Sequence, residues 1–220
     1  LGGYRYIFGC DASFTEDGQP YLATSHQFRF SDKFIKEYLP HTLELGRSFV
    51  APEYQSSKAG AKSLFALDNL WDGIGGLVAT DPSVKYLSGK VTIYSSSPEL
   101  SRKAMIYYLD KSFGDREGLI TSKNPELWTE EQAAMFDEMF TGANYKENYQ
   151  ILNNYVKSFG DTIPPLIHSY IGLSSTMKTF GTTFDPDFGD CYDTAMIITI
   201  DDIYQEKRER YIESYHKNNN

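Results

Sequence analysis

The stretch LELGRSFV, residues 43–50, decides the fold that we expect for this chain of 220 residues. Its alternation predicts a β-strand with two sides. One side carries Leu43, Leu45, Arg47 and Phe49, and the other carries Glu44, Gly46, Ser48 and Val50. A loop of small residues follows, and a helix is predicted from about Lys62 because apolar residues then recur at helical spacing. Gly75 and Gly76 inside this helix predict a close approach to a sheet or a ligand.

Further strands and helices surround this unit of strand, loop and helix. Strands are predicted at 3–8, 90–94, 179–184 and 195–200, and helices at 31–38, 97–111, 129–140, 145–159, 164–173 and 203–215. This order predicts an α/β fold in which helices flank a mixed sheet. We expect one domain over 1–202 with a helical insertion at about 124–173, then a charged helix and tail at 203–220. Because the chain begins with Leu1 inside an expected strand, we expect the N-terminal part of the fold to be missing.

The composition disfavours several classes of protein. Hydrophobic residues make up 40% and charged residues 23%, as in globular domains. A net charge of −9 disfavours nucleic-acid binding, which needs a basic surface. No apolar run approaches the roughly 18 residues of a membrane-spanning helix. Cys10 and Cys191 cannot build a disulfide framework, so we expect free thiols in the reducing cytoplasm.

The loop before the helix has the composition of an anion site. Small residues at a helix N-terminus leave backbone N–H groups free, and the helix dipole favours a phosphate there. Gln55, Lys58, Gly60 and Lys62 lie in this segment, and the two lysines add positive charge. There is no strict glycine fingerprint, so an ordinary connection between strand and helix is the alternative.

Several motifs in one order resemble a known family. They are ELGRSFV at 44–50, PEYQ at 52–55, LWDGIG at 70–75, and IPPL at 163–166 with DPDFG at 185–189. Together they resemble the GNAT-fold acyltransferases called hemolysin-like, which include the N-acyltransferases that make ornithine and glycine lipids. The strand motif is also similar to that of the acyl-homoserine-lactone synthases. The resemblance covers about residues 1–202, and Gln55 stands where the family usually has Arg.

The resemblance implies an enzyme with an acyl thioester as cosubstrate. A fatty-acyl group would move from coenzyme A or an acyl carrier protein to the amine of an amino acid or of an amino-acid-derived lipid precursor. The pantetheine arm of the donor would enter between strands 43–50 and 90–94 as an added strand. A backbone N–H near Phe49 or Val50 would stabilise the oxyanion, and Gln55, Lys58, Gly60 and Lys62 would bind the donor.

Three side chains have expected roles toward the acceptor, which is a small-molecule amine. Glu44 is the candidate general base. Arg47 would orient a carboxylate of the acceptor or hold Glu44. Asp187 would contact the acceptor amine. The alternatives are a structural ion pair between Glu44 and Arg47 and a solvated acidic turn around Asp187, and the opposite sides of an ideal strand argue against that ion pair.

Partners and alternative functions complete the expectations. An acyl carrier protein is acidic, so a local basic patch is expected at Lys58, Lys62, Lys85, Lys90, Arg102 and Lys103. No metal is expected, because His26, His41, His168 and His216 lack the spacing of ligands. Peripheral membrane contact is left open. A coenzyme A-dependent acetyltransferase and a non-catalytic domain that binds an acyl chain or a partner are the alternatives.

Overall fold

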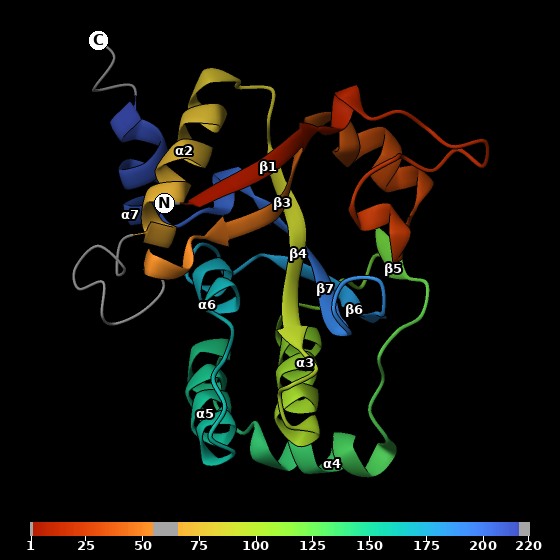
Figure 1. The fold of residues 1–220 in the computed structure, drawn as a ribbon, viewed down its shortest axis with the longest axis vertical. Helices are drawn as coiled ribbons and strands as arrows, with labels where there is room; N and C mark the ends of the chain where they lie inside the picture. The colour runs from red at the N-terminus through yellow and green to blue at the C-terminus, as the bar shows by residue number, and fades with distance from the viewer. Residues whose placement is uncertain (1, 55–65, 216–220) are drawn as a thin grey trace.

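A five-stranded mixed sheet forms the centre of the computed structural model, which describes residues 2–54 and 66–215. The strands lie in the order β1 (Gly2–Phe8), β3 (Thr42–Val50), β4 (Tyr86–Tyr94), β7 (Cys191–Thr199) and β6 (Lys178–Asp185). Among the described residues, β3 and β4 are parallel and the other neighbours are antiparallel. The sheet and its flanking helices confirm the predicted α/β class (Figure 1).

Five α-helices contribute to the apolar core on one face of the sheet, which we call the helical face. They are α2 (Ala66–Thr80), α3 (Glu99–Phe113), α4 (Glu130–Met139), α5 (Tyr145–Ser158) and α6 (Pro165–Ile171). Leu43, Leu45 and Trp71 belong to the apolar core between these layers, so Trp71 is a core residue. The predicted capping box of Thr129 and Gln132 is present at the start of α4. Within the described ranges, no helix has the length and hydropathy needed to cross a bilayer.

The helix α2 lies against the C-terminal helical segment, formed by α7 (Gln205–Arg208) and the π-helical turn η8 (Glu209–Glu213) (Figure 1). Gly75 permits this contact, because a Cβ there would lie 1.9 Å from the carbonyl oxygen of Tyr211. A close approach at Gly75 and Gly76 is therefore present, but its partner is a helix, not the predicted sheet or ligand. The boundary predicted at residue 202 stays a prediction.

Residues 9–41, which we call the cap, cover the opposite face of the sheet, the capped face. The cap contains η1 (Gly9–Asp11), η2 (Thr24–His26), β2 (Phe28–Phe30), η3 (Phe34–Tyr38) and η4 (Leu39–His41). Its apolar residues pack with Ala195 and Ile197 of β7. The strand β2 pairs with β5 (Ile120–Ser122), a two-stranded sheet that the sequence did not predict. The helix expected at 31–38 is present mainly as the π-helical turn η3.

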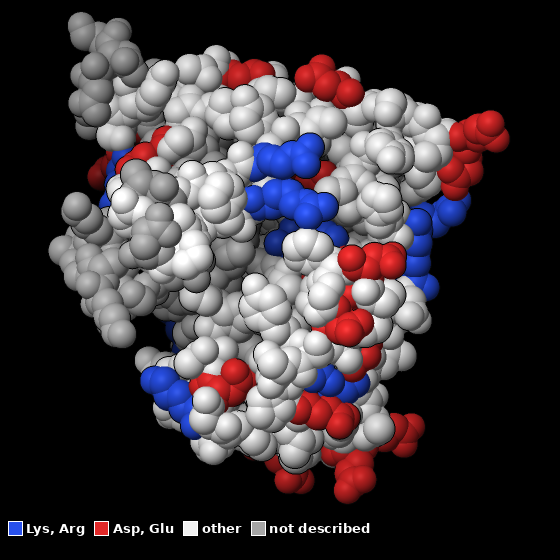
Figure 2. Space-filling model, in the orientation of Figure 1, with Lys and Arg blue, Asp and Glu red and all other residues white. Residues whose placement is uncertain are grey.

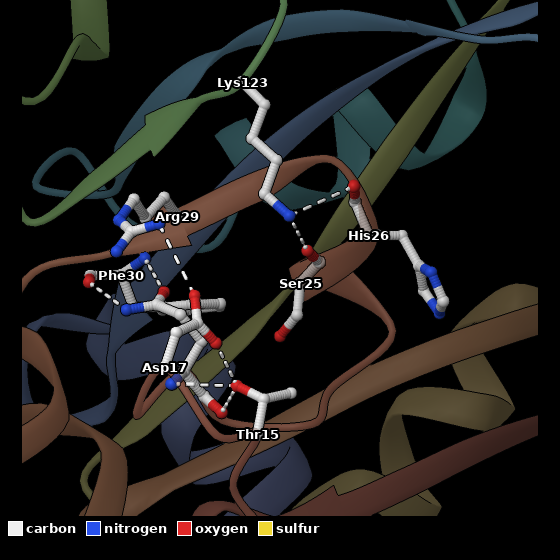
Figure 3. A network of polar contacts seen from close by, with 8 residues as sticks. Thr15, Asp17, Ser25, His26, Arg29, Phe30 and Lys123 are labelled. Atoms are coloured by element: carbon white, nitrogen blue, oxygen red, sulfur yellow. Dashed lines mark hydrogen bonds and ion pairs between the residues drawn. The ribbon is translucent and has the colours of Figure 1, made fainter.

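Polar contacts join parts of the cap to one another and to Lys123, which follows β5 (Figure 3). The Lys123 ammonium donates to the carbonyl oxygen of Ser25 at 2.7 Å. The side-chain amide of Gln19 bonds to both backbone groups of Phe30, at 2.8 and 3.1 Å. These bonds and the pairing of β2 with β5 hold the cap over this face of the sheet.

Candidate functional site

The parallel strands β3 and β4 pair over half of their length and then separate. Their register runs from Thr42 opposite Tyr86 to Leu45 opposite Gly89, although the strands continue to Val50 and Tyr94. At the last pair they are close, because a Cβ on Gly89 would lie 2.8 Å from the carbonyl oxygen of Leu45. Beyond it, β3 pairs with β1 and β4 pairs with β7, so the edges that face each other lose their partner. We call this gap the opening.

A β-bulge bends β3 beside the opening. Gly3 pairs with Phe49 and Arg5 pairs with Gly46, so two residues of β3 oppose Tyr4 alone. One of these two, Arg47, has a φ of 52°, an uncommon value for a residue other than glycine. A bulge leaves an extra residue outside the ladder and re-aims the strand. The alternation predicted for 43–50 is therefore wrong after Gly46, because it assumed an ideal strand.

The Glu44 carboxylate lies on the capped face and is 5% exposed. Its Oε2 accepts the backbone N–H of Ala23 at 3.0 Å, and its Oε1 accepts that of Thr24 at 3.1 Å. The Thr24 hydroxyl donates to Oε1 as well. These bonds hold the start of η2 against β3. A carboxylate oxygen has two lone pairs, so Oε2 keeps capacity for a proton or a water. The role of Glu44 as a base stays a prediction.

The Arg47 side chain contacts the tip of the hairpin between β6 and β7. Its guanidinium carbon lies 5.1 Å from the centroid of the Phe188 ring, a cation–π arrangement. Asp187, which was predicted to contact the acceptor amine, precedes Phe188 and is exposed. Because Phe188 contacts Arg47, the hairpin places Asp187 near β3. Among the described residues, the ion pairs do not include one between Arg47 and Glu44.

The residues predicted to bind the donor divide into two groups. The first group is Phe49, which is 61% exposed at the end of β3, and Val50. Tyr94, which the sequence did not single out, is 63% exposed at the end of β4, so aromatic residues flank the mouth of the opening. Val50 is half-buried. The second group, Gln55, Lys58, Gly60 and Lys62, lies outside the described residues, and its binding roles stay predictions.

Each of the three strands at the opening carries one basic residue. They are Arg5 in β1, Arg47 in β3 and Lys90 in β4. Figure 2 shows basic side chains gathered at the centre of the view, over these strands. The Lys90 ammonium pairs with Asp193 at 2.8 Å and also contacts the side-chain oxygen of Gln27. Arg5 was not singled out from the sequence, because only the register between strands places it beside Gly46.

Two residues of the predicted carrier patch are buried. Arg102 is 9% exposed, and its guanidinium carbon lies 4.2 Å from the centroid of the Tyr192 ring. Lys103 is 8% exposed and pairs with Glu126 at 2.6 Å. These two charges do not face a partner protein, so this part of the patch is wrong. Lys85 remains exposed.

Buried aromatic residues lie behind the bulge, on the helical face. Tyr4 contacts Trp71, with ring centroids 6.4 Å apart, and Trp71 contacts Tyr170 at 5.5 Å. Burial raises the pKa of Tyr4 to about 12, and burial also raises the pKa of Tyr170. The Tyr4 hydroxyl lies beside Ser48 and Tyr170 without a well-formed hydrogen bond to a described residue. The raised pKa makes the Tyr4 hydroxyl a weaker acid than that of a free tyrosine, so it stays protonated at neutral pH.

A cavity of about 330 Å³ lies away from the opening, between α3, β5 and β6. Its apolar wall includes Ile106, Leu109, Ile120 and Phe180. None of the described residues predicted for the site lines it. Within residues 2–54 and 66–215, no three His, Cys, Asp or Glu side chains gather as a metal site would require.

Two curated proteins are similar to this chain over nearly its whole length. A glycine N(alpha)-acyltransferase of Phocaeicola vulgatus is 50% identical over 217 residues, which are 99% of this chain and 66% of that protein. A glycine N(alpha)-acyltransferase of Bacteroides thetaiotaomicron is 51% identical over 215 residues, which are 98% of this chain and 64% of that protein. The chain thus spans slightly less than two thirds of the length of these relatives. No family model and no solved structure matches it.

Proposed function

We propose that this chain is the acyl-transfer part of an N-acyltransferase. In this reaction an acyl group passes from a thioester of coenzyme A or of an acyl carrier protein to the amine of an amino acid, with glycine as the first candidate. The observation that carries the proposal is the opening between β3 and β4, with its bulge and the buried Glu44 beside it. The names of two relatives at 50% and 51% identity support an amine acceptor and glycine in particular.

The donor fits the opening by backbone pairing. The pantetheine arm contains amide groups, which can bond to the strand edges that face each other beyond Leu45 and Gly89. The thioester carbonyl would then lie at the bulge, where Ser48 and its neighbours have backbone groups outside the ladder. A backbone N–H of this segment, towards Phe49 or Val50, would stabilise the negative charge on the tetrahedral oxygen.

The chemical step is direct attack by the amine on the thioester carbon. A C–N bond forms, the C–S bond breaks, and the thiolate leaves. Glu44 would accept the amine proton through its Oε2, directly or through a water.

The finer parts of the proposal concern the donor and the role in the cell. The resemblance to the hemolysin-like GNAT acyltransferases supports a fatty-acyl donor and a place in lipid biosynthesis. An acyl carrier protein would have to bind without Arg102 and Lys103, which are buried. Acetyl transfer from coenzyme A remains the alternative for the donor.

Mass spectrometry of product mixtures tests the proposal. The chain is incubated with short, medium and long acyl thioesters of coenzyme A and of an acyl carrier protein, each with glycine and a panel of amino acids. We expect N-acylglycine, and the absence of every acylated amine would overturn the proposal. Glu44→Gln is expected to lower kcat by roughly 10²-fold or more with unchanged donor KM, the usual size for a general base. The exposed Glu37→Gln serves as the matched control.

A further inference from the structure

Gly46 leaves a space in a row of side chains on the capped face. Arg5 pairs with Gly46, and Lys90 follows Gly89 at the last pair with β3. Residues opposite one another on neighbouring strands project to the same face, so Arg5 and Lys90 flank Gly46. A Cβ at Gly46 would meet no atom within 4 Å. Across two strand spacings, the flanking Cα atoms lie roughly 10 Å apart.

Basic and amide side chains lie on the two strands beside this space and on the cap that faces Lys90. Arg5 is exposed, and no ion pair joins it to another described residue. The charge of Lys90 is compensated by Asp193, which is 2% exposed. The Gln27 amide faces Lys90 with its oxygen, while its Nε2 is buried and has no acceptor among the described residues. A guanidinium and a buried N–H without a partner form a donor set that suits a carboxylate.

A negative charge lies at the other end of the same space. Glu44 precedes Gly46 by two residues, before the bulge, so both project to the capped face. Its Oε2 accepts the N–H of Ala23 and retains a lone pair. The space therefore has a guanidinium beside it and a carboxylate along the strand, which complements the carboxylate and amine of one small amino acid.

We propose that the space over Gly46 is the acceptor subsite and that Arg5 holds the carboxylate of a small α-amino acid there. The inference rests on the proposed acyl transfer and names the part of the site that recognises the acceptor. The sequence predicted that Arg47 holds the carboxylate of the acceptor. The proposal gives this role to Arg5 on the neighbouring strand, because Arg47 stacks on Phe188. Because Gly46 has no side chain, the space between Arg5 and Glu44 is open to an acceptor of the size of glycine.

Gly46→Ala tests the space. The backbone of Gly46 is outside the left-handed region and the added Cβ meets no protein atom, so the free protein should fold with unchanged Tm. In the proposed complex the same methyl group competes with the acceptor, and the KM for glycine should rise on the order of 10-fold. Gly73→Ala is the matched control, since Gly73 is exposed on α2 and equally open.

Arg5→Gln tests the carboxylate contact. Loss of one charge-assisted bond should raise the KM for glycine roughly 10- to 100-fold and leave the donor KM unchanged. Acylation of glycinamide, which lacks the carboxylate, should be slow and insensitive to Arg5→Gln. Arg116→Gln, which removes an exposed arginine paired with Asp110, is the control.

The outcomes separate the two proposals. No product from the unaltered chain overturns the acyl-transfer proposal and the subsite with it. If product forms and the KM for glycine is unchanged in both Gly46→Ala and Arg5→Gln, the acceptor subsite is overturned and the acyl-transfer proposal stands. If Arg5→Gln raises the KM for the donor but not the KM for glycine, Arg5 contacts the donor. That result also overturns the proposed acceptor subsite.

Discussion

The backbone N–H of Thr24 donates to the Oε1 of Glu44 at 3.1 Å, and the Thr24 hydroxyl donates to the same oxygen. These two bonds join the cap to the strand that borders the opening. The proposed base therefore also anchors the cap beside the proposed acceptor subsite. Its orientation depends on a residue 20 positions earlier in the chain.

Thr24→Val should destabilise the protein, because it removes a buried donor to a carboxylate. We expect a loss of about 1 to 2 kcal/mol in the free energy of unfolding, measured by urea denaturation. Thr24→Ser keeps the hydroxyl and should lower the free energy of unfolding by less. Equal stability of Thr24→Val and the unaltered chain would contradict the anchoring role.

Gly75→Ala should weaken the contact between α2 and the C-terminal helical segment. The new Cβ would lie 1.9 Å from the Tyr211 carbonyl oxygen, so the helices must move apart, at a cost of about 1 to 3 kcal/mol. Gly73→Ala in the same helix meets no atom and should raise stability by up to about 1 kcal/mol through helix propensity. Thermal unfolding measures both, and a loss of similar size at the two positions would exclude the packing explanation.

The two cysteines should differ in reactivity. Cys10 is exposed, whereas Cys191 is buried and burial raises the pKa of its thiol to about 11. Since the thiolate is the reactive form, a thiol reagent at neutral pH should label Cys10 in the folded protein. Cys191 should react only after unfolding. Rapid labelling of two thiols in the folded state, counted by mass, would argue against this burial.

The ion pairs of Glu117 should make stability depend on pH. Hydrogen bonds and charge from Lys178 and Lys33 lower the pKa of Glu117 from its ordinary value of 4.5 to about 2. A lowered pKa in the folded state adds stability above the ordinary value, and this contribution is lost as the pH falls from 4.5 towards 2.

Glu117→Gln should therefore lower Tm at pH 7, and the difference should shrink as the pH approaches 2. Paired thermal scans of the unaltered chain and the variant across this range measure it. Glu37→Gln, at an exposed position in the same cap as Lys33, is the control. A difference that does not change with pH would show that the lysines do not act on an ionised Glu117.

Local patterns predicted most helices and strands of the fold. The Thr129 capping box and the strand at residues 43–50 are encoded by neighbouring residues, and both are present. The pairing of β2 with β5 joins segments about 90 residues apart, and no local pattern encodes such a contact. The buried Arg102 was misplaced for a related reason, since the Tyr192 ring that covers it comes from a distant strand.

The candidate site was predicted in part. Family resemblance singled out Glu44 and Arg47, and both lie beside the opening. The bulge at Arg47 was missed, because an alternating strand and a bulged one have the same local sequence signal. Arg5 and Gly46 acquire their proposed meaning only from the register of three strands, and that register is a property of the folded sheet.

The separation of β3 and β4 also affects how the protein associates with other chains. Most sheets confine exposed edges to their two outermost strands, but here two further edges lie inside the sheet. Exposed strand edges are templates for other extended chains and promote self-association. If the proposed donor binds between β3 and β4, it would occupy these edges and protect the chain against aggregation.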